Sequence, residues 1–281
     1  MPKPPIDIIR QALTEDGAES DITTLSTVPE GQQARANILA RQDGVIAGLE
    51  VAVATFQELD ARIALEQLVK DGASVHSGEV LARLSGPARS ILSAERVAMN
   101  FLGHLSGIAT LTAQCVHAVE GTRARILDTR KTTPGLRALE KEAVRLGGGQ
   151  NHRFGLNDGV LIKDNHIKAA GGITEAVMAA RKAAPHLLKI EVECETLAEV
   201  RKALEAGADV VLLDNMGVEM MREAVTLVRR TNPAVLIEAS GNIGTHPARL
   251  AAVAATGVDF ISLGALTHSA ANFDASLEFE E

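Results

Sequence analysis

The sequence has almost no aromatic residues. Its 281 residues include no Trp and no Tyr, and six Phe leave the aromatic content at 2%. Proteins that bind nucleic acids by stacking bases need a supply of rings, so this class is disfavoured. The formal net charge of -8 likewise argues against a general polyanion-binding surface and against anchoring on an anionic membrane. The hydrophobic core must be built from Ala, Val, Ile and Leu.

Cysteines and long apolar runs are also scarce. Cys115 and Cys194 lie far apart and provide neither a disulfide framework nor zinc-ligand spacing, so we expect reduced, buried thiols. Glu193 and Glu195 flank Cys194 and would raise its pKa, which argues against a nucleophile. No run approaches the roughly 20 apolar residues of a membrane span, and MPKPPIDIIRQAL lacks the apolar stretch of a signal peptide. We therefore expect a soluble, cytoplasmic protein.

Positive charge is concentrated in one part of this acidic chain. Residues 123–168 contain ten Lys or Arg against five Asp or Glu. Such an excess forms either a solvated basic face or an anion site, and the motifs described below favour the anion site.

The first 110 or so residues predict a small N-terminal α+β domain with an antiparallel sheet, which we place at residues 1–112. A short helical pattern precedes an alternating strand at 34–43, and a helix is expected over 49–59. Residues 90–119 are long and periodic, with glycines at 103 and 107, and we interpret them as two helices.

After residue 120 the pattern becomes strand, loop and helix. The expected strands are 124–128, 159–163, 188–193, 210–214, 235–239 and 260–263, with helices at 173–184, 196–206, 218–231 and 247–255. Apolar strands alternating with helices indicate parallel pairing. Six strands suggest an open, incomplete (β/α) barrel or a doubly wound sheet. Polar residues or glycines at every strand end favour the barrel, which we place at 113–265, with 266–281 packing back on the first domain.

The densest cationic motif is DTRKTTPGLR at 128–137. Arg130 and Lys131 leave a strand end together and precede a rigid Pro-Gly turn, an arrangement that suits a fixed anion. The alternative is a loop whose charges keep it solvated.

A second motif, GGGQNHRFG, occupies residues 147–155. Its glycines either allow close approach of a ligand or stop a preceding helix, and His152 and Arg153 add a donor and a cation. Lys163, at the next strand end, can hold a carboxylate. His166 is either a ligand contact or a structural hydrogen-bonding residue.

Carboxylates and glycines follow the later strands. Glu191 and Glu193 share one face of a strand, and Asp214 ends the next one, so these groups either serve Mg²⁺ chelated by substrate phosphates or pair with nearby cations. The glycine-containing loops after the last two strands predict a phosphate-binding site made of backbone N–H groups. Its candidate residues are Ser240, Gly241, Asn242 and Gly264.

Long segments of the chain resemble type II phosphoribosyltransferases, specifically the quinolinate phosphoribosyltransferase family (nicotinate-nucleotide pyrophosphorylase, carboxylating). The resemblance is carried by SAERVAMNFLGHLSGIAT at 93–110, DTRKTTPGLR at 128–137, GGGQNHRFGLNDGVLIKDNHI at 147–167, EVE at 191–193, LLDNM at 212–216 and EASGNI at 238–243. It implies a pentosyltransferase of NAD biosynthesis that joins quinolinate to phosphoribosyl pyrophosphate with loss of pyrophosphate and CO₂. It also implies a subunit of two domains, an N-terminal α/β sandwich at residues 1–112 and an open, incomplete (β/α) barrel, and a homodimer with a shared active site.

The resemblance implies a role for each matching residue. Quinolinate carboxylates would be held by Arg96, reaching across the dimer, and by Arg130, Lys131, His152, Arg153 and Lys163. Glu193 and Asp214 would serve the ribose and Mg²⁺-pyrophosphate, with Lys131 completing the catalytic set. Ser240, Gly241, Asn242 and Gly264 would bind the phosphoribosyl group.

Three alternatives stay open. A relative with the same fold could use nicotinate, or it could be a molybdenum-operon homologue with another acceptor. A monocarboxylate would require fewer cations than this chain offers. A non-catalytic sugar-phosphate binder would need the phosphate site but not Glu193 and Asp214.

Overall fold

The computed structural model describes residues 5–280, which form two compact units. The first unit comprises 5–113, 134–148 and 270–280, and the second comprises 114–133 and 149–269. The expected domain ranges stay a prediction, and their outer ends, residues 1–4 and 281, lie outside the described residues. Among the described helices, none is long and apolar enough to cross a membrane.

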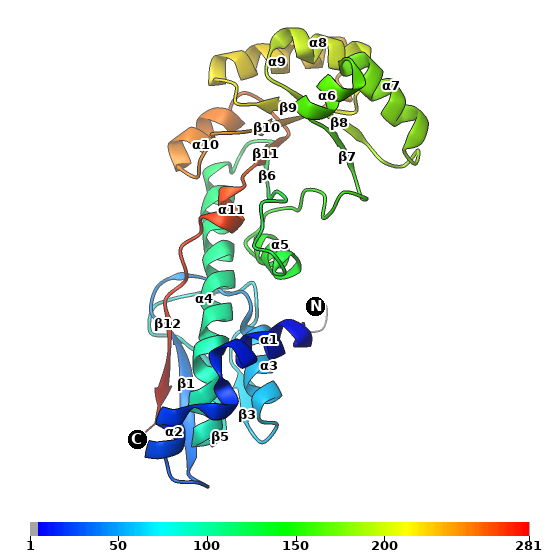
Figure 1. The fold of residues 1–281 in the computed structure, drawn as a ribbon. Helices are drawn as coiled ribbons and strands as arrows, with labels where there is room; N and C mark the ends of the chain where they lie inside the picture. The colour runs from blue at the N-terminus through cyan, green and yellow to red at the C-terminus, as the bar shows by residue number, and fades with distance from the viewer. Residues whose placement is uncertain (1–4, 281) are drawn as a thin grey trace. The chain divides into compact units, whose positions relative to one another are not determined.

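The first unit contains a four-stranded antiparallel sheet in the order β12-β1-β5-β3 (Figure 1). Its elements are α1 (Ile6–Asp16), a 3-10 turn (Ala18–Ser20), α2 (Ile22–Thr27), β1 (Gln33–Ala40), β2 (Gly44–Val45), α3 (Leu49–Leu59), β3 (Ala64–Gln67), β4 (Ser74–Val75), β5 (Val80–Pro87), α4 (Ala88–Ala118, whose last turn belongs to the second unit), α5 (Arg137–Leu146) and β12 (Ala275–Phe279). The last strand of the chain thus pairs with β1.

A single 31-residue helix, α4, replaces the two helices expected over 90–119, so that prediction was wrong. Gly103 and Gly107 do not interrupt it. A Cβ on Gly107 would lie 2.1 Å from the carbonyl oxygen of Ala271, and the Phe273 N–H donates to the carbonyl of Gly103 at 2.8 Å. The glycines therefore let the returning C-terminal backbone lie directly against the helix, and this packing offsets their weak helix propensity.

The second unit contains a six-stranded sheet in the order β6-β11-β10-β9-β8-β7, in which every pair is parallel. Its elements are β6 (Arg125–Leu127), β7 (Val160–Ile162), α6 (Asp164–Ala170), α7 (Ile173–Ala183), β8 (Ile190–Cys194), α8 (Leu197–Glu205), β9 (Val210–Asp214), α9 (Val218–Thr231), β10 (Leu236–Ser240), α10 (Pro247–Ala254), β11 (Phe260–Ser262) and α11 (Ala265–His268).

This strand order is that of a barrel opened between its first two strands. From β7 to β11 each strand lies beside its predecessor, and β6 follows beyond β11. In a doubly wound sheet, the order in which successive strands are added would instead reverse at a switch point. Helices α7 to α10 lie together on the outer side of the strands (Figure 1). The expectation of an open barrel of six parallel strands with an N-terminal α/β unit is confirmed.

The alternation of side chains along the strands places polar residues on the interior face of the open barrel. Residues such as Val192, Val211 and Ile237 are fully buried and belong to the hydrophobic core. The residues directly before and after each of them in its strand face the other side, because side chains alternate along a strand. Polar side chains therefore project into the open barrel from β8, β9 and β10.

Candidate active site

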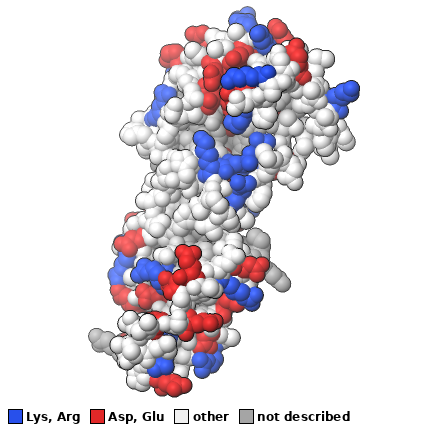
Figure 2. Space-filling view, in the orientation of Figure 1, with Lys and Arg blue, Asp and Glu red and all other residues white. Residues whose placement is uncertain are grey.

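A cavity of about 620 Å³ lies at the carboxyl ends of the strands of the second unit. In the space-filling view, Lys and Arg side chains gather beside a hollow in this part of the surface (Figure 2). The site residues predicted from the sequence that line it are Arg130, Lys131, His152, Arg153, Lys163, Glu193, Asp214, Ser240, Gly241 and Asn242. Residues from five strand ends therefore meet in one place, as in barrel enzymes.

Two predicted residues do not line this cavity. Gly264 precedes α11, where a Cβ would lie 3.0 Å from the Lys131 side chain, so it packs against a lining residue. Arg96 lies on α4 in the first unit, and its predicted approach across a dimer stays a prediction.

The loop after β6 is held by a hydrogen bond within it and by another from α11. The Lys131 N–H donates to Thr129 Oγ1 at 3.1 Å, and Thr267 Oγ1 donates to the Lys131 carbonyl at 2.7 Å. These bonds fix the backbone that carries Arg130 and Lys131 into the cavity, so both cations leave a constrained loop.

Arg153 is a cavity cation whose pKa is changed by its surroundings. Its Nη1 donates to the Gly159 carbonyl at 2.9 Å. Burial lowers the pKa of Arg153, and the neighbouring charge of Arg130 lowers it further. Two cations held close together in a partly buried cleft favour an anion between them.

The carboxylates of the cavity come from β8 and β9. Lys163 Nζ lies 2.5 Å from Glu193 Oε2, so the ion pair considered from the sequence is present. Burial and the charge of Glu193 raise the pKa of Asp214, while Asn215 donates to its Oδ2 at 2.6 Å. Two adjacent carboxylates that repel one another fit a divalent cation shared with substrate phosphates.

The turns after β9 and β10 have an unusual backbone. Asn215, Gly241 and Asn242 all adopt positive φ, at 56°, 77° and 49°. Asn242 Nδ2 donates to Asn215 Oδ1 at 2.8 Å, which ties the turns after β9 and β10 together. Left-handed Asn residues are uncommon, and strained backbone of this kind concentrates at functional sites.

Sequence reasoning did not include Glu238 among the site residues, although it lines the cavity. The spacing in the sequence could have indicated it, because Glu238 shares a strand face with Ser240 just as Glu191 shares one with Glu193. Thr129, Leu161, Leu212, Asn215 and Ser262 also line the cavity and were not predicted.

Contacts in the structure bear on three interpretations made from the sequence. His166 Nδ1 accepts the Lys163 N–H at 3.0 Å, which is a structural role. Gly147 ends α5, and a Cβ there would lie 2.3 Å from the Ala109 carbonyl, so this glycine serves helix packing. The two thiols are free and buried as expected. Burial raises the pKa of Cys194 to about 12, with smaller contributions from Glu199 and Glu193.

Family models match nearly the whole chain. The model described as quinolinate phosphoribosyl transferase, C-terminal domain, matches residues 108–278, and the corresponding N-terminal domain matches residues 21–106. The chain belongs to the quinolinate phosphoribosyl transferase family. The resemblance inferred from its motifs is thereby confirmed.

Individual members of this family are similar over their full length. The chain is 46% identical to a probable nicotinate-nucleotide pyrophosphorylase [carboxylating] of Bacillus subtilis, over 96% of this chain and 92% of that protein. It is also 46% identical to the nicotinate-nucleotide pyrophosphorylase [carboxylating] of Mycobacterium leprae, over 97% and 96%. The crystal structure of the Ehrlichia chaffeensis nicotinate-nucleotide pyrophosphorylase superposes with a TM-score of 0.93 at 38% identity, covering both chains completely.

Proposed function

We propose that this chain transfers the phosphoribosyl group of phosphoribosyl pyrophosphate to quinolinate, with decarboxylation, in the biosynthesis of NAD. The products are nicotinate mononucleotide, pyrophosphate and CO₂. The observation that carries the proposal is a single cavity in which a cation cluster, a carboxylate pair and the Ser240–Asn242 turn meet.

The cation cluster suits a dicarboxylate acceptor. Arg130, Lys131, Arg153 and Lys163 all line the cavity, and Arg96 of the partner subunit would complete the set. Arginine binds carboxylates through two parallel hydrogen bonds, whereas lysine acts as a point charge. Quinolinate carries two carboxylates, so it can use several of these cations, whereas nicotinate can use fewer.

The other lining residues of the cavity, together with Gly264, suit phosphoribosyl pyrophosphate. We assign the phosphoribosyl group to Ser240, Gly241, Asn242 and Gly264. We assign the ribose and a magnesium ion to Glu193 and Asp214, whose oxygen donors fit magnesium that keeps substrate phosphates as ligands. When bound, magnesium would neutralise charge on the pyrophosphate.

The chemistry needs electrostatic stabilisation rather than a protein nucleophile. Departure of pyrophosphate leaves an oxocarbenium-like carbon, which Glu193 and Asp214 stabilise by their negative charge. The pyridine nitrogen attacks this carbon. The C2 carboxylate then leaves as CO₂, its bonding electron pair stays on C2 beside the cationic ring nitrogen, and a proton from water at C2 completes nicotinate mononucleotide. The two buried thiols take no part.

The first experiment measures pyrophosphate release with magnesium and phosphoribosyl pyrophosphate, comparing quinolinate with nicotinate. Release with quinolinate alone, together with CO₂, is the expected result. Release with nicotinate alone would reject the proposed acceptor. No pyrophosphate release with either acceptor would reject the proposed activity. Lys131→Ala and Arg153→Ala should abolish turnover while the fold is kept, whereas the exposed Lys168→Ala is a matched control that should remain active.

We further propose a cytoplasmic homodimer with shared active sites. Inactive Arg96→Ala and Lys131→Ala subunits, mixed at equal concentration and allowed to exchange, would form hybrids with one intact site. About a quarter of the wild-type activity should return, because half of the dimers are hybrids. No recovery after demonstrated exchange would show that Arg96 acts within its own subunit.

A further inference from the structure

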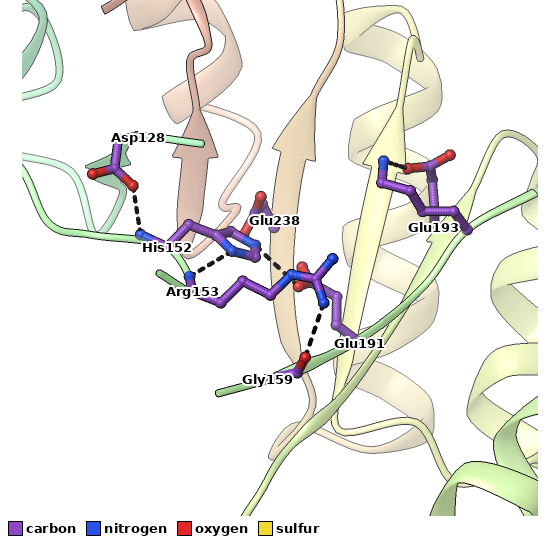
Figure 3. Close-up of polar contacts among 8 residues, drawn as sticks. Asp128, His152, Arg153, Gly159, Glu191, Glu193 and Glu238 are labelled. Carbon is purple, nitrogen blue, oxygen red and sulfur yellow. Dashed lines mark hydrogen bonds and ion pairs between the residues drawn. The ribbon is translucent and has the colours of Figure 1, made fainter. Parts of the chain in front are cut away.

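A histidine and two buried carboxylates form a connected group on the interior face of the open barrel (Figure 3). His152 Nε2 lies 3.1 Å from Glu191 Oε2 and 3.6 Å from Glu238 Oε2. Glu191 is only 7% exposed and Glu238 only 3%. Among the described residues this is the one group of three His, Cys, Asp or Glu side chains whose potential metal-ligating atoms all lie within 4.8 Å of one another.

The two buried carboxylates are not explained by a contribution to the stability of the fold. The Oε1 atoms of Glu191 and Glu238 are buried without a hydrogen-bond partner. Burying such groups costs free energy, and replacing buried ionic groups with apolar residues of similar volume is often neutral or stabilising. Burial and the charge of Glu191 raise the pKa of Glu238, so this residue favours the neutral acid. The arrangement therefore indicates a positional role.

The His152 ring connects the carboxylates to a cavity cation. Its Nδ1 accepts the backbone N–H of Arg153 at 2.7 Å, which requires a neutral ring with its proton on Nε2. Burial lowers the pKa of His152, whereas the hydrogen bond to Glu191 and the nearby carboxylates raise it overall; the Arg153 N–H that donates to Nδ1 opposes a second ring proton at that nitrogen. A ring proton on Nε2 satisfies Glu191 and leaves Nδ1 for Arg153.

The same segment is fixed from its other side. Asp128 Oδ1 accepts the His152 N–H at 2.9 Å, and Arg153 Nη1 donates to the Gly159 carbonyl at 2.9 Å. Figure 3 therefore shows a hydrogen bond at the backbone of His152, at its ring and at the guanidinium of Arg153. Of these anchors, only the ring is held by the two strand carboxylates.

We propose that Glu191 and Glu238 are positioning residues of the acceptor subsite, which act through the His152 ring to fix Arg153 against a substrate carboxylate. This inference rests on the proposed function for the identity of that carboxylate. Loss of either carboxylate would free the ring to turn, loosen the Arg153 amide and misplace its guanidinium. The phosphoribosyl pyrophosphate side of the cavity would be unaffected.

The test compares Glu238→Leu with Glu238→Gln in the full-length enzyme. Leu removes the polar head at similar volume, whereas Gln keeps a neutral group that can donate to Glu191 and accept from its surroundings. We expect Glu238→Leu to fold normally and to raise KM for quinolinate by about 10- to 100-fold, with KM for phosphoribosyl pyrophosphate unchanged. Glu238→Gln should restore KM for quinolinate to within about threefold of the wild type.

Equal increases in both KM values would indicate general damage and overturn the proposal, as would an unchanged KM for quinolinate in Glu238→Leu. If Glu238→Leu does not fold, Glu191→Gln provides the same comparison with the ring contact weakened. Stoichiometric metal that copurifies with the wild type and is lost in His152→Asn would also overturn the proposal, because the three side chains would then be ligands.

A second readout does not depend on turnover. Nitrogen-15 chemical shifts of His152, assigned by their loss in His152→Asn, report which ring nitrogen carries the proton. We expect the Nε2–H form in the wild type and a mixture of tautomers in Glu238→Leu. An unchanged tautomer would overturn the proposal even if quinolinate is the substrate. A changed tautomer in an enzyme inactive with quinolinate would instead reject only the proposed function.

Discussion

Gly241 occupies a position where a single methyl group should disable the site. Its φ is +77°, and an added Cβ would lie 2.4 Å from Asn215 Oδ1 and 2.5 Å from Asp214 Oδ1. Ordinary contact begins near 3.4 Å, so both side chains would have to move by about 1 Å. A misplacement of that size can cost about 100-fold in rate, equivalent to about 2.7 kcal/mol of transition-state stabilisation. We therefore expect Gly241→Ala to lower kcat/KM for phosphoribosyl pyrophosphate by about 100-fold.

The control for this experiment is Gly207→Ala. Gly207 has a similar φ of +83°, but an added Cβ would meet nothing within 4 Å. Both variants should lose about 1–2 kcal/mol of unfolding free energy from left-handed strain, and only Gly241→Ala should lose activity. A kcat/KM within about threefold of wild type for Gly241→Ala, measured by pyrophosphate release, would refute the reasoning.

Three further outcomes follow from buried groups. The pKa of Glu238 is raised from 4.5 to about 8 in the folded protein, so its contribution to the free energy of unfolding should decline as pH rises between these values. Chemical denaturation across that range should show this decline in the wild type and a flatter profile in Glu238→Gln. Gly107→Ala should lower the free energy of unfolding by about 3 kcal/mol, because its Cβ would overlap the Ala271 carbonyl; a melting temperature equal to wild type would contradict this. Cys115 and Cys194 are buried with raised pKa values, so iodoacetamide at pH 7.5 should label neither in the native enzyme, as mass spectrometry can check.

Local patterns were sufficient for most of the secondary structure. The helix expected over 49–59 and the one over 218–231 match α3 and α9. The strand expected at 210–214 is β9. These segments carry strong apolar periodicity and clear end signals, so neighbouring residues decide their conformation. The short helix α6 was not predicted, because its seven residues bury no side chain and show no periodic signal.

Contacts between residues far apart in the sequence explain why the prediction of two helices over 90–119 was wrong. Gly103 and Gly107 weaken helix propensity locally, yet α4 runs through both because the 271–273 backbone packs there. No pattern within the helix predicts that contact, since its partner lies more than 160 residues away in the sequence. The pairing of β12 with β1 is likewise a property of the folded chain.

The sequence by itself determined the type of chemistry and most of its residues, because the cations, carboxylates and glycines occupy the ends of recognisable strands, and parallel strands bring their ends together. Only the tertiary structure decided which groups touch. It paired Lys163 with Glu193, and it placed Glu191 and Glu238 around the His152 ring. Those contacts depend on the register and curvature of β8 and β10, which are set by packing across the whole sheet rather than by any local run of residues.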